Sequence, residues 1–198
     1  MAILTFVRYG AEQSGYVREV NKPVDRHMHS TPITSIRELL QELLRHRDPE
    51  AYGAILLRYA VPTYDLETYF RWNTRHYTRT CIHRNEEFEL LVICYEPGQR
   101  TSLHDYDSQM AWIHPVMGEV VEERFALIPG NGIRRTSEVH RHPGEVDRIS
   151  EGIAIRRFTN VGPGRAVTVN LYAKPMSKWR VYDEHTGATT ITSPGPPR

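Results

Sequence analysis

Residues Phe88 to Gly118 read FELLVICYEPGQRTSLHDYDSQMAWIHPVMG, and this stretch predicts the fold. One apolar run, Leu90–Tyr95, ends at a Glu-Pro-Gly turn, and a second, Met110–Met117, ends at Gly118. A polar corner, His104-Asp105-Tyr106, lies between them. Strand, turn, polar corner and strand are the outline of a metal-binding hairpin in a small β-barrel, which would hold one small ligand inside.

The composition is that of a soluble globular protein, with 198 residues, 39% hydrophobic and 25% charged, which suits one structural domain. A net charge of +1 argues against nucleic acid as the main partner. No apolar run reaches the ~20 residues of a membrane helix, so we expect no membrane partner. We find no signal peptide, and the two cysteines, Cys81 and Cys94, are expected to be buried free thiols, so a cytoplasmic location is predicted.

Helical periodicity before the barrel predicts a cap of helices. Ser35 is expected to cap a helix whose apolar face begins at Ile36, with Glu38 completing a capping box. A second helix is predicted from Asp48 to about Ala60, because Asp48 can act as N-cap and a proline follows at the first helical position. A third, short helix is predicted from about Tyr64 to Trp72.

From Tyr77 onward the apolar residues alternate with a period of two, and Pro- and Gly-containing turns separate short runs. This spacing is typical of an all-β sandwich or barrel. The end of the chain, TTITSPGPPR, is rich in Pro and Gly and is predicted to be disordered. We therefore divide the single domain into an arm, a helical cap, a barrel and a disordered tail, at residues 1–30, 31–76, 77–187 and 188–198.

The run from Tyr77 to about Gly187 resembles the cysteine dioxygenase (thiol dioxygenase) family of cupins. The resemblance implies a mainly β fold, the cupin barrel (double-stranded β-helix or jelly roll), with an N-terminal helical cap. The matching segments, in chain order, are Tyr77-Thr78-Arg79, the strand ICYEPG, the corner Ser102–Tyr106, Gly118 with the acidic strand after it, Arg156–Asn160, Val167–Tyr172 and Tyr182–Gly187.

In that family three histidines hold a ferrous ion, an arginine binds the substrate carboxylate, and a tyrosine hydroxyl points at the reacting oxygen. The resemblance puts His104, Tyr106 and Arg156 at the three ligand positions, Arg79 at the carboxylate-binding position and Tyr172 at the tyrosine. It thus implies catalytic residues His104, Tyr106 and Tyr172, metal ligands His104 and Tyr106, and substrate-binding residues Tyr77, Arg79, Arg156, Thr168 and Asn170.

Two interpretations remain open, because the guanidinium of Arg156 has no lone pair to offer a metal. In the first, His104 and a Tyr106 phenolate, helped by water or substrate, hold iron or another divalent metal such as nickel. The protein is then an oxygen-dependent oxidoreductase of the cysteine dioxygenase type, acting on a small cysteine-like thiol or amino acid. In the second, no metal is bound, and Arg79 and Arg156 face one cavity that binds or rearranges a small anion.

Either interpretation expects a small anionic, amino-acid-like substrate and a monomer or homodimer. His114 and the string His140-Arg141-His142, with Glu145, offer further ligand atoms, but we expect hydrogen-bonded or solvated side chains there. Arg79 also has a structural interpretation, as the ion-pair partner of a glutamate within residues 119–123. Asp105 is expected to make a turn hydrogen bond.

Overall fold

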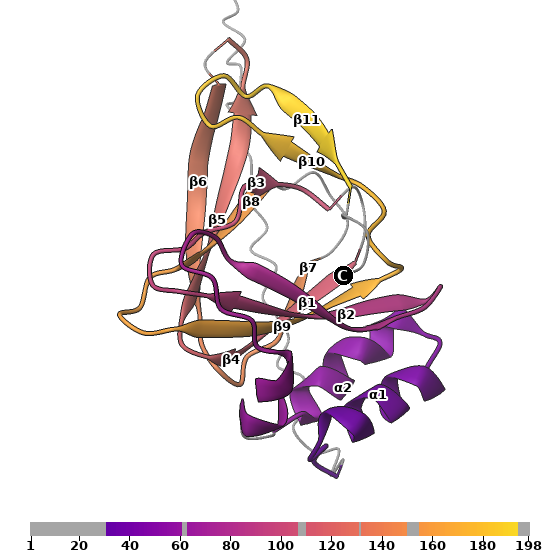
Figure 1. The fold of residues 1–198 in the computed structure, drawn as a ribbon. Coiled ribbons are helices and arrows are strands. Elements are labelled where there is room, and N and C mark those ends of the chain that lie inside the picture. The colour runs from indigo at the N-terminus through magenta and orange to yellow at the C-terminus, as the bar shows by residue number, and fades with distance from the viewer. Residues whose placement is uncertain (1–30, 61–62, 107–109, 131, 150–154, 194–198) are drawn as a thin grey trace, which may run out of the picture. The chain divides into compact units, whose positions relative to one another are not determined.

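The computed structural model describes residues 31–60, 63–106, 110–130, 132–149 and 155–193; the predicted arm lies outside these ranges. Two antiparallel sheets enclose the barrel interior, with strand orders β1-β2-β9-β4-β7 and β11-β10-β3-β8-β5-β6 (Figure 1). No helix within the described ranges is long and apolar enough to cross a bilayer. The strands are β1 (Thr78–Arg84), β2 (Phe88–Tyr95), β3 (Leu103–His104), β4 (Ala111–Met117), β5 (Val120–Ile128), β6 (Gly132–Arg141), β7 (Asp147–Ile149), β8 (Ile155–Asn160), β9 (Ala166–Ala173), β10 (Trp179–Tyr182) and β11 (Thr189–Thr192).

Strands β2 and β9 of the five-stranded sheet are buried on both faces, because helices cover one face and the barrel interior lies against the other. Every residue of β2 and of β9 is buried. On β9, Val169 and Leu171 pack into the core shared with the helices. The alternate residues Asn170 and Tyr172 line the barrel cavity. Strand alternation thus separates a packing face from a chemical face.

The helical cap begins where the sequence predicts it. Its elements are α1 (Ile36–Arg45), the 3₁₀ turn η1 (Pro49–Ala51) and α2 (Tyr52–Arg58). The Ser35 side chain caps α1 by accepting the Glu38 amide. The Glu38 carboxylate accepts the Thr34 amide at 2.7 Å, one residue before the amide that a capping box would use. Asp48 caps η1 as predicted.

Aromatic and ionic contacts join the cap to the five-stranded sheet. The Tyr52 ring meets Phe88 and Trp112 edge to face, at centroid distances of 5.8 and 5.6 Å. Glu50 receives two hydrogen bonds from Arg148 of β7, at 2.7 and 2.6 Å. Since edge-to-face pairs contribute about 0.5–1.5 kcal/mol each beyond the area they bury, these contacts fix the cap on the sheet.

The predicted third helix is wrong in type. The chain forms two 3₁₀ turns there, η2 (Thr63–Asp65) and η3 (Glu67–Tyr69). Asp65 accepts hydrogen bonds from the Ile36 amide and the Tyr59 hydroxyl, at 2.5 and 3.1 Å. These long-range bonds hold the segment against the first two helices.

The predicted disordered tail is also wrong for Thr189–Thr192, which form β11 and pair with β10. The six-stranded sheet therefore extends past residue 187, and residues 194–198 lie outside the described part. Cys94 is buried as expected, but Cys81 is exposed, next to a bulge in the edge strand β1.

Gly118 makes the tight passage from β4 to β5. Its φ is 68°, and a Cβ atom built on it would lie 2.5 Å from the Arg165 carbonyl oxygen. Neither the dihedral nor the space suits another residue. This glycine, predicted as the end of the hairpin, brings two strands of different sheets together.

Candidate functional site

His104 ends the short strand β3, which joins β10 on one side and β8 on the other. Its Nδ1 lies 2.8 Å from the Ser102 carbonyl oxygen, so Nδ1 carries the proton and Nε2 keeps its lone pair. Burial, together with the charges of Arg156 and Arg79, lowers the pKa of His104 to about 4, against the hydrogen bond to Ser102, which raises it. The imidazole is therefore neutral near pH 7 and acts as an acceptor.

Asp105 anchors this corner from the outer side, in a way that the sequence analysis missed. Its carboxylate is buried and accepts hydrogen bonds from Arg180 Nε at 2.8 Å and from the Tyr182 hydroxyl at 2.6 Å. Both partners belong to β10, so the carboxylate links β10 to the corner, and the expected turn hydrogen bond stays a prediction. The link holds the corner that carries His104 and Tyr106.

Tyr106 fills the space beside His104. Its ring meets the imidazole edge to face at 5.0 Å and lies 5.5 Å from the Tyr172 ring. Burial raises the pKa of Tyr106 well above its usual range, and Tyr172 raises it further. Tyr106 is therefore a neutral phenol in this structure, and metal ligation would require it to lose its proton.

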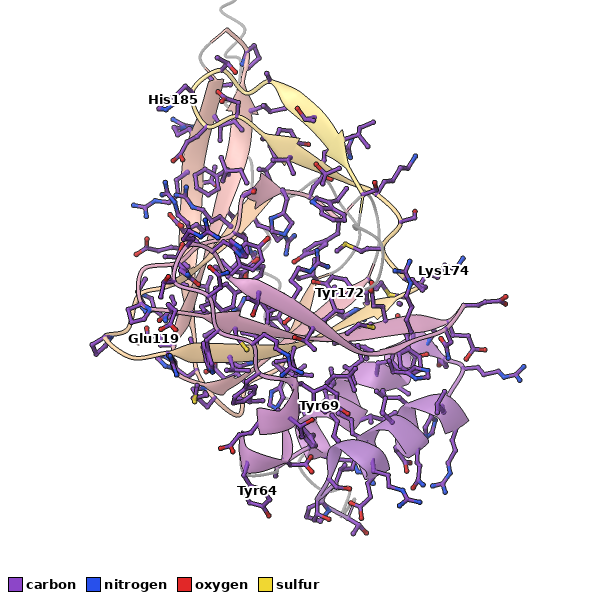
Figure 2. The ribbon with its side chains drawn as sticks, in the orientation of Figure 1. Tyr64, Tyr69, Glu119, Tyr172, Lys174 and His185 are labelled. Atoms are coloured by element: carbon purple, nitrogen blue, oxygen red, sulfur yellow. The ribbon has the colours of Figure 1, made fainter. Side chains whose placement is uncertain are left out.

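Tyr172 points from β9 into the space between the sheets (Figure 2), and two neighbours on the same face hold its hydroxyl. Thr168 Oγ1 donates to Asn170 Oδ1 at 2.6 Å, and Asn170 Nδ2 donates to the Tyr172 hydroxyl oxygen at 3.3 Å. The Tyr172 proton is then free to be donated elsewhere. Thr168 does not line the cavity; its hydrogen bond holds the side chain of Asn170 in place.

Arg79 projects from β1 into the cavity, and its neighbours are aromatic. Its guanidinium carbon lies 5.3 Å from the centroid of the Trp179 ring. Tyr77, just before β1, stacks on Tyr95 at 5.7 Å. Among the described residues no carboxylate forms an ion pair with Arg79, so the structural alternative for it is not supported.

One small interior cavity, with a volume of about 30 Å³, collects most of the predicted site. Ordinary ligand pockets measure roughly 300–1,000 Å³, so this one accepts only a very small ligand unless side chains move. The predicted residues that line it are Tyr77, Arg79, His104, Tyr106, Asn170 and Tyr172.

Arg156 does not line the cavity as predicted. It pairs with His104 across β3 and β8 and lies over the Tyr106 ring, 5.5 Å from the centroid. Its guanidinium donates to Glu122 Oε1 at 3.1 Å, and both side chains are buried. The sequence analysis did not identify Glu122 as its partner.

Glu122 joins three strands, because it also accepts from Arg124 of β5 at 3.1 Å and from Arg141 of β6 at 2.8 Å. Burial alone would raise the pKa of Glu122, but hydrogen bonds from Arg124 and Arg141 outweigh it, and the pKa is lowered. An ionised carboxylate inside the barrel therefore holds Arg156 in place.

The model of the family "Cysteine dioxygenase type I" matches residues 23–185. The chain belongs to this family. It is 25% identical to human cysteine dioxygenase type 1 over 142 residues, 70% of this chain and 71% of the relative. The Danio rerio protein is 23% identical over 128 residues, 62% of this chain and 64% of that one.

Among the solved structures that resemble this chain is TT1209 from Thermus thermophilus, with a TM-score of 0.47 and 20% identity over 56% of this chain and 94% of that one. Another is a Klebsiella pneumoniae protein with a double-stranded β-helix domain, with a TM-score of 0.47 and 15% identity over 65% of this chain and 89% of that one. The fold of this cysteine dioxygenase family member is the cupin barrel.

The residues at the family's three iron-ligand positions do not fit a three-histidine centre. His104 alone offers an imidazole; Tyr106 is a neutral phenol, and Arg156 is a cation already bonded to Glu122. A cation beside a divalent metal repels it, and arginine has no lone pair to donate. Among the described residues no group of three His, Cys, Asp or Glu side chains is arranged to hold a metal ion.

The other three histidines considered as possible ligands are hydrogen-bonded or exposed to solvent, as expected. His114 is buried and hydrogen-bonds the Glu145 carbonyl oxygen through Nδ1 at 2.8 Å. His140 is exposed and contacts the Glu119 carboxylate. His142 is exposed, next to the turn after β6. None of them points to the cavity.

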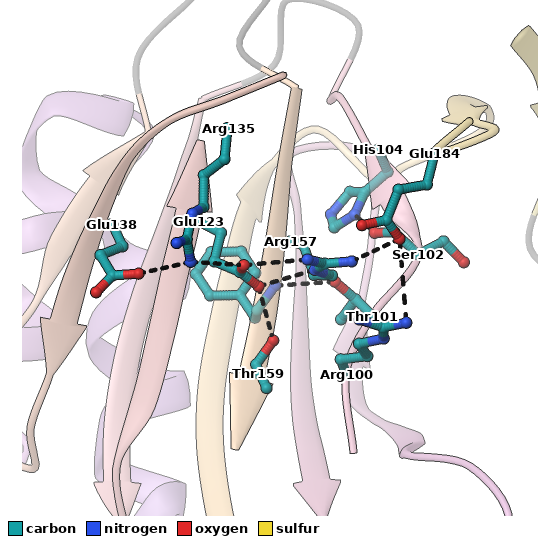
Figure 3. Close-up of polar contacts among 11 residues, drawn as sticks. Arg100, Thr101, Ser102, His104, Glu123, Arg135, Glu138, Arg157, Thr159 and Glu184 are labelled. Atoms are coloured by element: carbon teal, nitrogen blue, oxygen red, sulfur yellow. Dashed lines mark hydrogen bonds and ion pairs between the residues drawn. The ribbon is translucent and has the colours of Figure 1, made fainter. Parts of the chain in front are cut away.

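The next residues along β5 and β8 face outward and make a second ion network (Figure 3). Glu123 accepts two hydrogen bonds from Arg157, at 2.8 and 3.0 Å, and Arg157 also reaches Glu184 at 3.0 Å. Glu122 thus pairs with Arg156 on one face of the sheet, and Glu123 pairs with Arg157 on the other. The pair of Glu122 and Arg156 is the one next to the site.

Proposed function

We propose that this cysteine dioxygenase family member binds a small, cysteine-like carboxylate inside its barrel and acts on the group beside that carboxylate. The observation that carries the proposal is the position of Arg79. It faces the cavity and has no carboxylate partner among the described residues, whereas Arg124, Arg141 and Arg156 all reach Glu122. A guanidinium in such surroundings suits a planar anion bound by two parallel hydrogen bonds.

The rest of the cavity would supply two neutral groups to the bound carboxylate. The unprotonated Nε2 of His104 accepts a hydrogen bond from a thiol, hydroxyl or amine of the ligand. The Tyr172 hydroxyl, held by Asn170, donates one. This acceptor and donor support proton transfer at the group next to the carboxylate, and the reaction needs no step at Arg156.

Binding of small carboxylates tests the proposal. L-Cysteine and 3-mercaptopropionate should raise the melting temperature of the protein, and isothermal titration calorimetry should give a saturable heat. Arg79→Met should weaken binding by at least tenfold, because the ligand loses its charge partner. Arg134→Met removes an exposed arginine on β6 and serves as the matched control. Equal affinities in wild type and Arg79→Met would reject the proposal.

A second candidate is the oxygen-dependent oxidation that the relatives' name describes. It is favoured by the gathering of four residues at one cavity: His104, which matches an iron-ligand position, and Arg79, Tyr77 and Tyr172, which match the family's substrate side. Metal analysis of untagged protein, followed by oxygen uptake with L-cysteine, separates the two. Stoichiometric iron or nickel that is lost in His104→Ala supports oxidation; absence of metal under every loading condition removes this candidate.

A further inference from the structure

Trp179 bounds the cavity on the side of Arg79. It is partly exposed and lines the cavity, so its ring forms part of the wall between the cavity and solvent. Its ring covers one face of the Arg79 guanidinium at 5.3 Å. An aromatic ring over the face of an arginine leaves the N–H edges available and fixes the plane in which they point.

The segment that brings Trp179 to this place runs from β9 of one sheet to β10 of the other. Its first amide, that of Lys174, donates to the Glu87 carbonyl oxygen at 2.7 Å. The Met176 amide donates to the buried carboxylate of Glu89 at 3.3 Å. We call residues 174–178 the strap; both bonds tie it to the start of β2.

The far end of the strap is tied to the catalytic corner. In β10, two residues after Trp179, Val181 pairs with His104 of β3. Glu89 is held in turn by Arg84 at 3.6 Å, and Arg84 also donates to the Met176 carbonyl oxygen at 3.5 Å. Because both ends are fixed, the backbone that carries the indole is held beside Arg79.

We propose that Trp179 is the residue that limits the length of the carboxylate ligand; this inference rests on the proposed role of Arg79. With the indole in place, the cavity has a volume of about 30 Å³, and a ligand whose carboxylate meets the Arg79 edge has its chain confined between the rings of Tyr106, Tyr172 and Trp179. Removing the indole opens this wall to solvent, so longer chains then fit beside the same guanidinium.

The test compares ligand length profiles. Binding of acetate, propionate, butyrate and hexanoate is measured by calorimetry for wild type, Trp179→Leu and Trp179→Phe. In wild type the affinity should fall with chain length, whereas Trp179→Leu should bind hexanoate at least tenfold more tightly than wild type does. Trp179→Phe keeps a ring over Arg79 and should retain the wild-type order.

Trp72 provides a matched control, because it lies over Arg165 at 4.4 Å in the same kind of contact and does not line the cavity. Trp72→Leu should leave the length profile unchanged. If Trp179→Leu fails to fold, Trp179→Met takes its place, because it also removes the ring over Arg79 and should bind hexanoate at least tenfold more tightly than wild type does.

The outcomes separate the two proposals. An identical length profile in wild type and Trp179→Leu overturns the role of Trp179 and leaves carboxylate binding at Arg79 intact. If no carboxylate binds to wild type, or if Arg79→Met binds acetate as well as wild type does, the proposed function fails, and the role of Trp179 fails with it.

Discussion

The buried carboxylate of Glu122 offers the most direct test of how the barrel interior is held. Glu122→Gln removes the charge that receives Arg156, Arg124 and Arg141. Arg124 has 42% of its side chain exposed and can turn to water. Arg141 keeps Asp147 at 2.6 Å. The main loss falls on Arg156, whose side chain is 5% exposed.

Removing one partner of a buried ion pair costs about 3–5 kcal/mol. Because Arg141 keeps a partner and Arg124 can reach water, we expect the lower end, about 3 kcal/mol in the free energy of unfolding. The measurement is urea unfolding followed by circular dichroism, with linear extrapolation to water. Glu138→Gln is the matched control, since it breaks an exposed pair with Arg135 and should cost less than about 1 kcal/mol.

The pH dependence supplies a second readout of the same substitution. Since the arginine bonds hold the pKa of Glu122 below its ordinary value of 4.5, its contribution is fully present above about pH 4.5 and is lost as pH falls through the folded pKa. Glu122→Gln should therefore lose less stability than wild type does on acidification below that pH. The reasoning would be refuted if Glu122→Gln lowered the free energy of unfolding no more than Glu138→Gln does and if its loss of stability below about pH 4.5 equalled that of wild type.

Three further predictions follow from the site. Tyr106→His with Arg156→His should create a site that binds ferrous iron or nickel, measured as metal content after loading, because it restores imidazoles at both altered positions. Asp105→Asn should lower the free energy of unfolding by about 1–3 kcal/mol, since it weakens charge-assisted bonds that hold the corner. Burial lowers the pKa of His114, against its hydrogen bond to Glu145, so its contribution to stability is present above about pH 6.5 and lost as pH falls; His114→Gln should flatten this loss in urea unfolding between pH 7 and 5.

Each has its own control. Tyr106→His with Arg157→His puts the second imidazole on the outer face, so metal uptake by this variant as well would contradict the register that pairs His104 with Arg156. Asp183→Asn changes an exposed turn aspartate, and an equal loss there would show that Asp105 has no special role. If the free energy of unfolding of His114→Gln fell with pH as steeply as that of wild type between pH 7 and 5, the prediction for His114 would be wrong.

Local signals in the sequence were sufficient for the first two helices and most strands, but not for the third helix. Ser35 caps α1 because its side chain serves an amide three residues away. Asn170 and Tyr172 were assigned to the site by the family resemblance, and alternation along β9 explains why both line the cavity. The strand β11 was missed because its pairing with β10 is a tertiary contact, while the Pro- and Gly-rich residues after it dominate the local composition.

The interior ion pairs were beyond such signals, because the partners are far apart in the chain. Arg156 and Glu122 meet through the register of β5 with β8, in which Glu122 lies opposite Phe158. Asp105 meets Arg180 through the pairing of β3 with β10. A strand pattern indicates which face a side chain occupies, but the choice of its partner depends on a register that only the assembled sheet defines.

The interior ion pair gives the barrel a cross-link that no chelator can remove and no change of redox potential can alter. One carboxylate ties β5, β6 and β8 through three guanidinium groups. A metal ion at the same place would also offer coordination positions that substrates enter and leave. A guanidinium bonded to a carboxylate offers none, so under the proposed function ligands exchange at the hydrogen-bonding edge of Arg79.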